Sequence, residues 1–264
     1  MTDLRIFSYL PNPRLWKAAI AARLTGVDIE VVGAKPHEIA GWLWDFDARP
    51  LGAVSDEDKA AAARAARTGF SGTLYKTDAF LIAHPFGTVP AAFSGDGSVG
   101  VFESNSIMRC VARLGRNAYP AYGRDAYEAS RIDSYLDASL VFARDSQIYL
   151  LSLGDELTTE VHSRAAQAFE TWMSGIEAGL ADRAFLVGED VTLADICFAC
   201  ELTLFSRERV ARKALSRLDL QPITRLDAYP RARAHYEALC RHAAFAPDMA
   251  DYLAKLGAEI ARLS

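Results

Sequence analysis

The first part of the chain changes from a strand pattern to a helix pattern and back. Residues 4–9 form a short apolar run, and a turn with two prolines, residues 11–13, follows it. Large apolar side chains then recur at helical spacing until Gly26 ends the pattern, namely Trp16, Ile20 and Leu24. Residues 28–32 return to a strand pattern. This order predicts a βαβ unit in which the two strands lie parallel.

A second strand pattern is followed directly by a helix pattern. Residues 89–93 and 99–102 are short apolar runs, and the glycine-rich turn between them predicts a β-hairpin. The predicted helix after the hairpin has apolar side chains on one face, at Ile107, Cys110, Val111 and Leu114. Ser104 stands at the start of this helix, where backbone N–H groups have no partner within the helix and can hold a carboxylate.

After Gly115 the strand patterns stop, and apolar residues recur only at helical spacing. Five helices are predicted, over residues 124–153, 157–180, 192–211, 229–242 and 247–263. Thr192 and Asp195 have the spacing of a capping box at the start of the third of these helices. The chain therefore predicts an α/β domain over residues 1–117 and an all-helical domain over residues 124–264.

Residues from about 33 to 72 interrupt the α/β pattern as an insertion. They contain an aromatic cluster, Trp42, Trp44 and Phe46, and Ser55 then caps an alanine-rich helix that is predicted to reach about Arg67. Two interpretations of the insertion stay open. It is either a surface loop, or a flap over a site or a contact with another subunit, since exposed aromatic residues favour interfaces.

Charge and composition narrow the possible partners. With a formal net charge of −5 and no basic run, the chain is not expected to bind nucleic acid. No apolar stretch reaches membrane-spanning length and the first residues lack a signal-peptide pattern, so a cytoplasmic protein without membrane contact is expected. The four cysteines predict no disulfide framework. Cys197 and Cys200 continue an apolar helix face, so we interpret them as core residues, and no metal site is predicted.

The stretch 84–109 has two features that suit an extended peptide. The Val89–Pro90 bond is expected to be cis, which would turn the polar backbone of Val89 outward, ready to pair with such a peptide. Ser104 offers a helix start for a carboxylate of the same peptide. Together these features indicate a glutathione site.

The same stretch, PFGTVPA followed by a turn and FESNSI, resembles the cytosolic glutathione transferases. A further match is VTLADI at residues 191–196, and the resemblance covers nearly all of the chain except the insertion. It implies a thioredoxin-like N-terminal domain that binds glutathione as co-substrate, followed by an all-α domain. It also implies a small hydrophobic electrophile as second substrate, and a dimer with an identical or a related subunit.

The resemblance also implies roles for individual residues at the glutathione site. The backbone of Val89, next to Pro90, would pair with the tripeptide. Ser104 would bind the γ-glutamyl carboxylate, and Glu103 would neutralise the neighbouring ammonium group. Lys76, which resembles the lysine that binds the glycine carboxylate in several classes of the family, would hold that carboxylate with its three donors.

Asn12 falls where many transferases of this family carry a catalytic serine. Its amide N–H would donate to the glutathione thiolate, near the positive end of the first helix. The alternative is that Asn12 only caps that helix or shapes the turn, a role that asparagine fills well. Ser8 and Tyr9 are weaker candidates, because they are predicted to lie in the strand.

Two functional interpretations follow from the resemblance. The first is a glutathione transferase, and Asn12 at this turn also resembles the bacterial glutathione-dependent β-etherases, whose thiolate displaces a phenolate from an aryl ether. An aromatic substrate would contact side chains on the first helix of the second domain, although these can equally pack in a core: Tyr135, Phe142, Arg144 and Tyr149. The rival interpretation is a non-catalytic binding module resembling the transferase-like domain of elongation factor 1 gamma.

Overall fold

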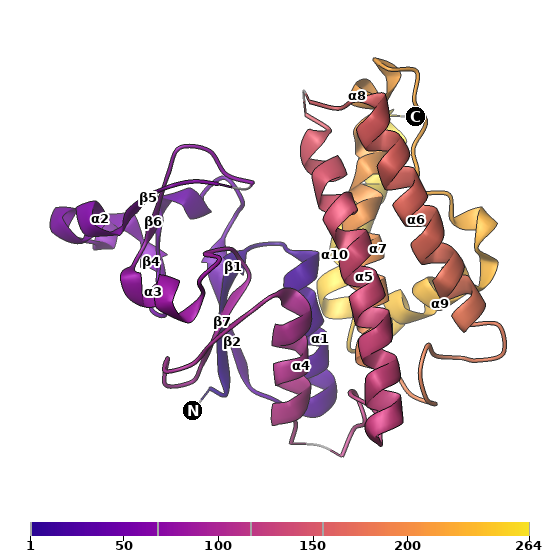
Figure 1. Cartoon of the computed structure of the whole chain (residues 1–264), viewed down its shortest axis with the longest axis horizontal. Coiled ribbons are helices and arrows are strands. Elements are labelled where there is room, and N and C mark those ends of the chain that lie inside the picture. Colours follow the sequence, from indigo (N-terminus) through magenta and orange to yellow (C-terminus); the bar gives the residue numbers. More distant parts are fainter. Residues whose placement is uncertain (1, 68, 117, 155, 264) are drawn as a thin grey trace. The chain divides into compact units, whose positions relative to one another are not determined.

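The computed structural model describes residues 2–67, 69–116, 118–154 and 156–263. The chain divides into unit 1, residues 1–119, and unit 2, residues 120–264 (Figure 1). Unit 1 combines strands with helices, whereas the described residues of unit 2 form helices and no strand. Each unit buries apolar side chains of its own.

Unit 1 is built on a four-stranded sheet in the order β2-β1-β7-β8. β1 (Leu4–Tyr9) runs parallel to β2 (Ile29–Ala34) and antiparallel to β7 (Ala91–Ser94). β7 in turn pairs antiparallel with β8 (Gly100–Phe102). The parallel pair and the hairpin that the apolar spacing predicts are therefore confirmed.

Two helices of unit 1, α1 (Pro13–Thr25) and α4 (Ser104–Leu114), pack against each other. Ile20 and Ile107 are almost fully buried, as their helical spacing predicts. Leu114, which the same spacing places on the apolar face, is 44% exposed, and α4 ends at this residue.

The insertion forms a second four-stranded sheet in the order β4-β3-β6-β5. Its elements, in chain order, are η1 (Ile39–Gly41), β3 (Trp42–Trp44), β4 (Arg49–Pro50), η2 (Leu51–Ala53), α2 (Asp56–Ala62), β5 (Ala63–Ala65) and β6 (Thr73–Lys76). The short helix α3 (Asp78–Ala83) follows β6 and leads back toward the main sheet.

The alanine-rich helix of the insertion is shorter than the sequence predicts. Ser55 caps it as expected, with its hydroxyl accepting the N–H of Asp58, but the helix ends at Ala62 and not near Arg67. The next residues pair with β6, where Ala63 lies opposite Tyr75. Pairing with a strand that follows later in the chain overrides the high helix propensity of alanine.

The aromatic residues of the insertion belong to the core of unit 1. Trp44 is 1% exposed, and its ring meets the rings of Phe7 of β1 at 5.5 Å and Phe80 of α3 at 6.0 Å. Trp42 and Phe46 are partly buried against the same cluster. The interpretation of these aromatic residues as an exposed surface is therefore wrong, because burying them supplies the apolar core for this face of unit 1.

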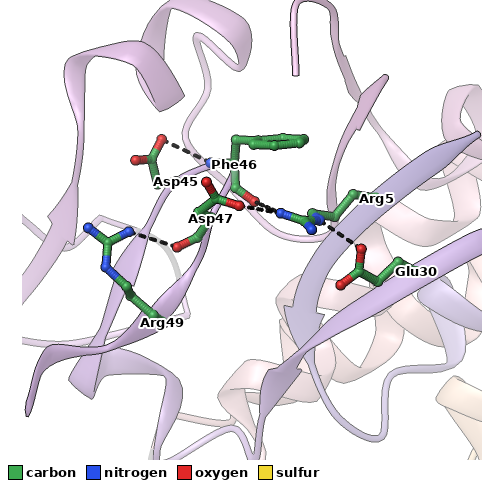
Figure 2. Close-up of polar contacts among 6 residues, drawn as sticks. All are labelled: Arg5, Glu30, Asp45, Phe46, Asp47 and Arg49. Carbon is green, nitrogen blue, oxygen red and sulfur yellow. Dashed lines mark hydrogen bonds and ion pairs between the residues drawn. The ribbon is translucent and has the colours of Figure 1, made fainter. Parts of the chain in front are cut away.

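Arg5 of β1 joins the insertion to the main sheet (Figure 2). Its Nε donates to Glu30 of β2 at 2.9 Å, and its Nη1 donates to both the Asp47 carboxylate and the Phe46 carbonyl. The guanidinium lies 4.5 Å from the centre of the Phe46 ring, which in turn packs edge-on against Phe93 of β7. Burial disfavours the charge, but hydrogen bonds to the two carboxylates outweigh it and raise the pKa of Arg5.

Unit 2 confirms the predicted helices to within a few residues, except that the third ends early. Its helices are α5 (Ala126–Ser152), α6 (Thr159–Gly179), α7 (Leu193–Phe205), η3 (Ser206–Val210), α8 (Arg212–Ser216), η4 (Leu226–Ala228), α9 (Pro230–Arg241) and α10 (Ala246–Leu263). The predicted third helix, 192–211, changes to a 3-10 helix after Phe205. The sequence pattern missed the short pieces α8 and η4.

The helix α7 begins with the predicted capping box between Thr192 and Asp195. The buried Asp195 carboxylate also accepts the N–H of Leu186 at 3.0 Å and lies 2.8 Å from Nε2 of His235. Along the same helix Cys197 and Cys200 are fully buried and form no disulfide with any described residue, which confirms their interpretation as core residues.

Neither a membrane span nor a metal cluster is found among the described residues. None of the helices in the described ranges is long and apolar enough to cross a membrane. Within the same ranges, no three histidine, cysteine, aspartate or glutamate side chains gather in a way that suits a metal ion.

Candidate functional site

The loop before β7 carries a polar backbone that is open to a partner. The Val89–Pro90 bond is cis, as the sequence predicts, and a second cis bond precedes Pro11. Val89 is half-buried against the core cluster of unit 1. Its backbone forms no hydrogen bond with another residue in the part of the chain that the structure describes. An extended peptide chain can therefore pair with this residue.

The hairpin that follows is closed by its turn and by the insertion. The carboxylate of Asp96 accepts the N–H of Ser98 at 3.0 Å and the hydroxyl of Ser94 at 2.6 Å. Gly97 has a φ of 76°, and a Cβ added there would lie 3.1 Å from the Phe46 ring. These contacts fix the path of the chain from β7 to the start of α4.

Glu103 occupies the cap position of α4 in an unusual conformation. Its φ is 67° and its ψ is 124°, a region that side-chain-bearing residues seldom adopt and that is found at functional sites. The exposed carboxylate does not cap the helix, and it forms no hydrogen bond or ion pair with any other described residue. The conformation therefore presents a carboxylate for an external cation.

Ser104 is the first residue of α4, so its hydroxyl lies beside backbone N–H groups that the helix cannot satisfy internally. The first hydrogen bond of the helix runs from the N–H of Ile107 to the carbonyl of Glu103. A helix start of this kind attracts a carboxylate. Together, Glu103 and Ser104 offer one partner for an ammonium group and one for a carboxylate, the two groups of an amino acid.

Lys17 of α1 reaches the same helix start, and the sequence reading missed it. Its side chain is only 1% exposed, and Nζ lies 2.8 Å from Oδ1 of Asn105 and 3.3 Å from Oγ of Ser104. The one signal in the sequence is a lysine between apolar residues, Trp16 before it and the alanines of the buried helix after it. Nothing local in the sequence shows that the lysine meets residues that lie 87 and 88 positions later.

Asn12 is the N-cap of α1 and is almost fully buried. Its Oδ1 accepts the N–H of Arg14 at 3.0 Å, and its Nδ2 donates to the hydroxyl of Ser8 at 3.0 Å. Ser8 and Tyr9 lie in β1, as predicted. One of the two amide hydrogens of Asn12 is thus used within unit 1, which leaves one for a ligand.

Lys76 lies at the end of β6 and not in a helix, because α3 begins only at Asp78. Its buried ammonium group donates to the Gly87 carbonyl at 2.7 Å and lies 4.8 Å from the centre of the Trp44 ring. Burial, with a smaller contribution from the charge of Arg67, lowers the pKa of Lys76. The side chain therefore braces the loop that leads to Val89.

His84, expected only as part of the turn before Pro85, is buried beside the same loop. Its ring stacks on Phe102 at 4.9 Å, and Nε2 lies 3.2 Å from the hydroxyl of Thr88. Nδ1 has no hydrogen-bond partner among the described residues. Burial and the nearby charge of Lys76 lower the pKa of His84 to about 4, so the ring is neutral at pH 7.

The four residues predicted to contact an aromatic substrate lie on α5 but have different surroundings. Phe142 is 2% exposed and stacks on Trp172 at 4.3 Å, so it belongs to the core of unit 2. Tyr149 is fully buried and donates to Glu208 at 2.9 Å, and burial raises the pKa of its hydroxyl. Tyr135 is half-buried and Arg144 is exposed. A substrate role for any of the four stays a prediction.

A family model and curated relatives match parts of the chain. Residues 155–238 match the model of the glutathione S-transferase C-terminal domain. Elongation factor 1-gamma of Trypanosoma cruzi is 36% identical over 121 residues, which is 45% of this chain and 28% of that protein. The chain spans only 28–37% of the length of several such relatives.

Solved structures resemble the chain over almost its whole length. A delta-class glutathione transferase of Nilaparvata lugens has a TM-score of 0.64 at 15% identity, with 99% of this chain and all of that chain covered. A glutathione S-transferase of Methylobacillus flagellatus with glutathione bound has a TM-score of 0.61 at 16% identity, covering 93% and 98%. The chain therefore has the glutathione transferase fold, a thioredoxin-like α/β unit followed by an all-α unit, as the sequence predicts.

Proposed function

We propose that this chain binds glutathione at the start of α4 and uses its thiolate to attack a hydrophobic electrophile. One observation carries the proposal. Glu103 and Ser104 place an exposed carboxylate and an uncapped helix start side by side. The γ-glutamyl end of glutathione has a free ammonium group and a free carboxylate on one carbon, and the two protein groups match them in charge. The open backbone of Val89 next to Pro90 supports pairing with the rest of the tripeptide.

The glycine end of glutathione is assigned to Lys76. Its ammonium group has three donors, and the bond to the Gly87 carbonyl uses one of them. A carboxylate at this side chain would also pair with a charge that burial otherwise disfavours. The same lysine would then hold both the loop and the ligand.

The proposed chemistry is a displacement at carbon. Bound glutathione loses its thiol proton to solvent, and the thiolate attacks an electrophilic carbon to form a C–S bond. The leaving group, a halide or a phenolate, departs with the electron pair of the broken bond. We propose that the remaining N–H of the Asn12 amide and the positive end of α1 stabilise the thiolate before attack.

The electrophile is proposed to be aromatic, with β-aryl ether cleavage as one form of the reaction. In that form the thiolate displaces a phenolate. The half-buried Tyr135 and the exposed Arg144 are the accessible members of the four substrate residues predicted on α5. Phe142 and Tyr149 would act only through the packing of unit 2. A dimer with an identical or related subunit is proposed as well.

A non-catalytic glutathione-binding module is the second candidate function. It is favoured by Asn12, whose amide already serves as a helix cap and as a donor to Ser8. Such a residue suits a structural role as well as a catalytic one. The sequence similarity to elongation factor 1-gamma supports the same candidate.

Two measurements test these candidates. Isothermal titration with glutathione measures binding, and the absorbance of the thioether formed from 1-chloro-2,4-dinitrobenzene measures transfer to an aryl electrophile. We expect saturable binding and turnover that depends on glutathione. Binding without turnover of this or other activated electrophiles would favour the non-catalytic module, and absence of binding would overturn both candidates.

A further inference from the structure

We propose that β2 joins two copies of this chain by pairing antiparallel with β2 of a second copy, about a two-fold axis at Val31. β2 is the first strand in the order β2-β1-β7-β8, and within the described ranges no strand pairs with its outer edge. An open strand edge is a template for pairing with another chain. The pairing is independent of the proposed function, since it uses the edge of the main sheet and no residue of the ligand site.

Alternate residues of β2 point their backbone groups away from β1. The carbonyls of Asp28 and Ala34 accept N–H groups at and next to the ends of β1, at 3.3 and 2.8 Å. The even-numbered residues from 28 to 34 therefore bond β1 in the parallel ladder, whereas Ile29, Val31 and Gly33 face outward. The N–H and C=O groups of these three residues form no hydrogen bond with any described residue.

The edge lacks the features that usually block pairing between chains. β2 is six residues long, contains neither proline nor lysine, and keeps its register with β1 without a bulge. Val31 is 37% exposed. The charged side chain within the strand, Glu30, accepts a hydrogen bond from Arg5 at 2.9 Å (Figure 2), so its charge is balanced within the chain.

The strand is self-complementary about Val31. The two-fold axis of an antiparallel pair passes between two directly opposed residues, so Val31 faces Val31 of the second copy and Ile29 faces Gly33. Of the possible registers, this one pairs all three outward residues of β2 with one another, and each pair can exchange both of its N–H···O=C bonds. Glu30 then lies opposite Val32, so no two like charges are directly opposed.

The residues that flank β2 carry opposite charges. In this register Asp28 of one copy and Lys35 of the other lie at the same end of the pairing, with their Cα atoms about 6 Å apart. Symmetry repeats the arrangement at the other end. Both side chains are exposed, and Lys35 now has Glu38 at 3.9 Å as an exposed partner. A second copy of this chain therefore matches the edge in hydrogen bonding and in charge.

The first test is the mass of the whole chain in solution, measured by sedimentation velocity over a wide range of concentrations. Pairing through one strand lies at the low end of interface sizes, so wild-type association should depend on concentration. Val31→Lys should halve the mass of the largest species, because it opposes two ammonium groups at the axis. Val31→Thr keeps a β-branched, uncharged side chain and should associate as the wild type does. Equal masses for wild type and Val31→Lys would overturn the proposal.

The second test uses the wild type, in case Val31→Lys fails to fold. Amide hydrogen exchange is followed residue by residue by NMR at low and high protein concentration. Exchange of the outward N–H groups of Ile29, Val31 and Gly33 should slow as the concentration rises. The N–H groups of Glu30 and Val32, which already bond β1, should change little. Exchange at Val31 that is independent of concentration would contradict the pairing.

The third test fixes the register. Val31→Cys places two thiols at the axis with a Cα distance of about 5.5 Å, which suits a disulfide, so oxidation should link two copies. Val99→Cys, at a residue that is 56% exposed elsewhere in unit 1, is the control and should link far less. Asp28→Lys should weaken association about 2- to 5-fold, and Lys35→Asp in the same chain should restore it. Equal linking of the two cysteine variants, or no restoration by the charge exchange, would overturn the register centred on Val31.

Discussion

Two helices of unit 1 begin in opposite ways. α1 closes its own N-terminus, because Asn12 accepts the N–H of Arg14 and Pro13 has no N–H to satisfy. α4 leaves its N-terminus open, because the Glu103 side chain makes no capping bond. Both starts carry the partial positive charge of a helix N-terminus. Of these two helices only α4 lacks a capping side chain, so a missing cap can mark a binding site.

The open start of α4 lowers the stability of the unliganded protein. A missing cap costs about 0.5–2 kcal/mol. The left-handed φ of Glu103 adds about 1–3 kcal/mol of backbone strain. A ligand carboxylate that replaces the cap would recover part of this free energy on binding.

A third helix, α7, is capped at its N-terminus by Thr192 and Asp195. Removing this cap should give the largest loss of stability. Asp195→Ala removes the acceptor for the buried N–H groups of Leu186 and Thr192. We expect the free energy of unfolding to fall by about 2–4 kcal/mol, measured by urea denaturation. Glutathione affinity of the folded fraction should stay unchanged. Normal stability combined with lost affinity would show that this helix start serves the ligand after all.

Substitutions at the open start of α4 should lower glutathione affinity, whereas the substitution in α7 lowers stability. Glu103→Gln and Ser104→Ala are expected to weaken glutathione binding about 10- to 100-fold, because each removes a partner of a charged ligand group. Glu103→Gln should be the more damaging, since it leaves the ligand's ammonium group without its counter-charge. Isothermal titration measures both, with Glu57→Gln in the first turn of α2 as a control for lost charge at another helix start. Unchanged affinity in both variants would move the site elsewhere.

Asn12→Ala opens the closed start of α1 and tests whether this cap also serves the thiolate. Losing the cap should lower the free energy of unfolding by about 1 kcal/mol. If the amide also donates to the thiolate, the thiol pKa of bound glutathione should rise by about one to two units. Turnover at pH 7 should then fall about 10- to 100-fold, with little change in affinity at low pH.

The thiolate absorbance of bound glutathione, titrated in wild type and variant, measures this pKa. Coincident titration curves together with lower stability would make Asn12 a cap alone. The thiolate would then be held by backbone N–H groups at the start of α1.

Acidification should lower the stability of the protein through His84, which lies in the segment that leads to the open start of α4. The folded chain binds a proton at His84 only near pH 4, whereas an unfolded chain binds it near 6.5. The free energy of unfolding is therefore unaffected by this group above pH 6.5, and it falls by up to about 3 kcal/mol as the pH falls toward 4. Thermal unfolding between pH 4 and 7 measures the loss, and His84→Gln should show a shallower slope. An equal slope in both proteins would place the titrating group elsewhere.

The smallest effect expected is a gain in stability at the open start. Glycine adopts the positive φ of Glu103 without a side-chain clash, so Glu103→Gly should relieve backbone strain in the folded chain. Glycine also gives the unfolded chain more backbone freedom, which opposes this gain. We expect a net increase of about 0.5 kcal/mol in the free energy of unfolding. The same variant should lose glutathione affinity, because the carboxylate is absent. A more stable and weaker-binding protein would show that the conformation of Glu103 serves binding. A destabilised one would mean that the strain is absent in solution.

Much of the fold and part of the site follow from local pattern. The alternation of residues 89–102, the spacing of Ile107 and Val111, and the box of Thr192 and Asp195 each lie within a few residues of one another. Strand and helix periods and caps depend on such short distances. The position of Ser104 at a helix start could therefore be predicted, because it required only the boundary between a hairpin and a helix.

Residues that act across the fold were predicted less well. The alanine-rich segment stops at Ala62 because its continuation pairs with β6, and Lys76 lies in that strand. Phe142 and Tyr149 have the same spacing whether they face a pocket or a core, and the structure places both in the core of unit 2. Local propensity cannot separate these alternatives, because the energy that decides between them comes from partners far away in the chain.

Local sequence patterns are sufficient to predict the two-unit order, the thioredoxin-like α/β pattern, the helices of unit 2 and the helix start at Ser104. In contrast, the burial of the insertion's aromatic residues in a core, and the contact of Lys17 with the first turn of α4, become visible only in the folded chain. The two groups of features differ in the range of the interactions that produce them. Periods, turns and caps act over a few residues, whereas burial and the pairing of charges join residues that only folding brings together.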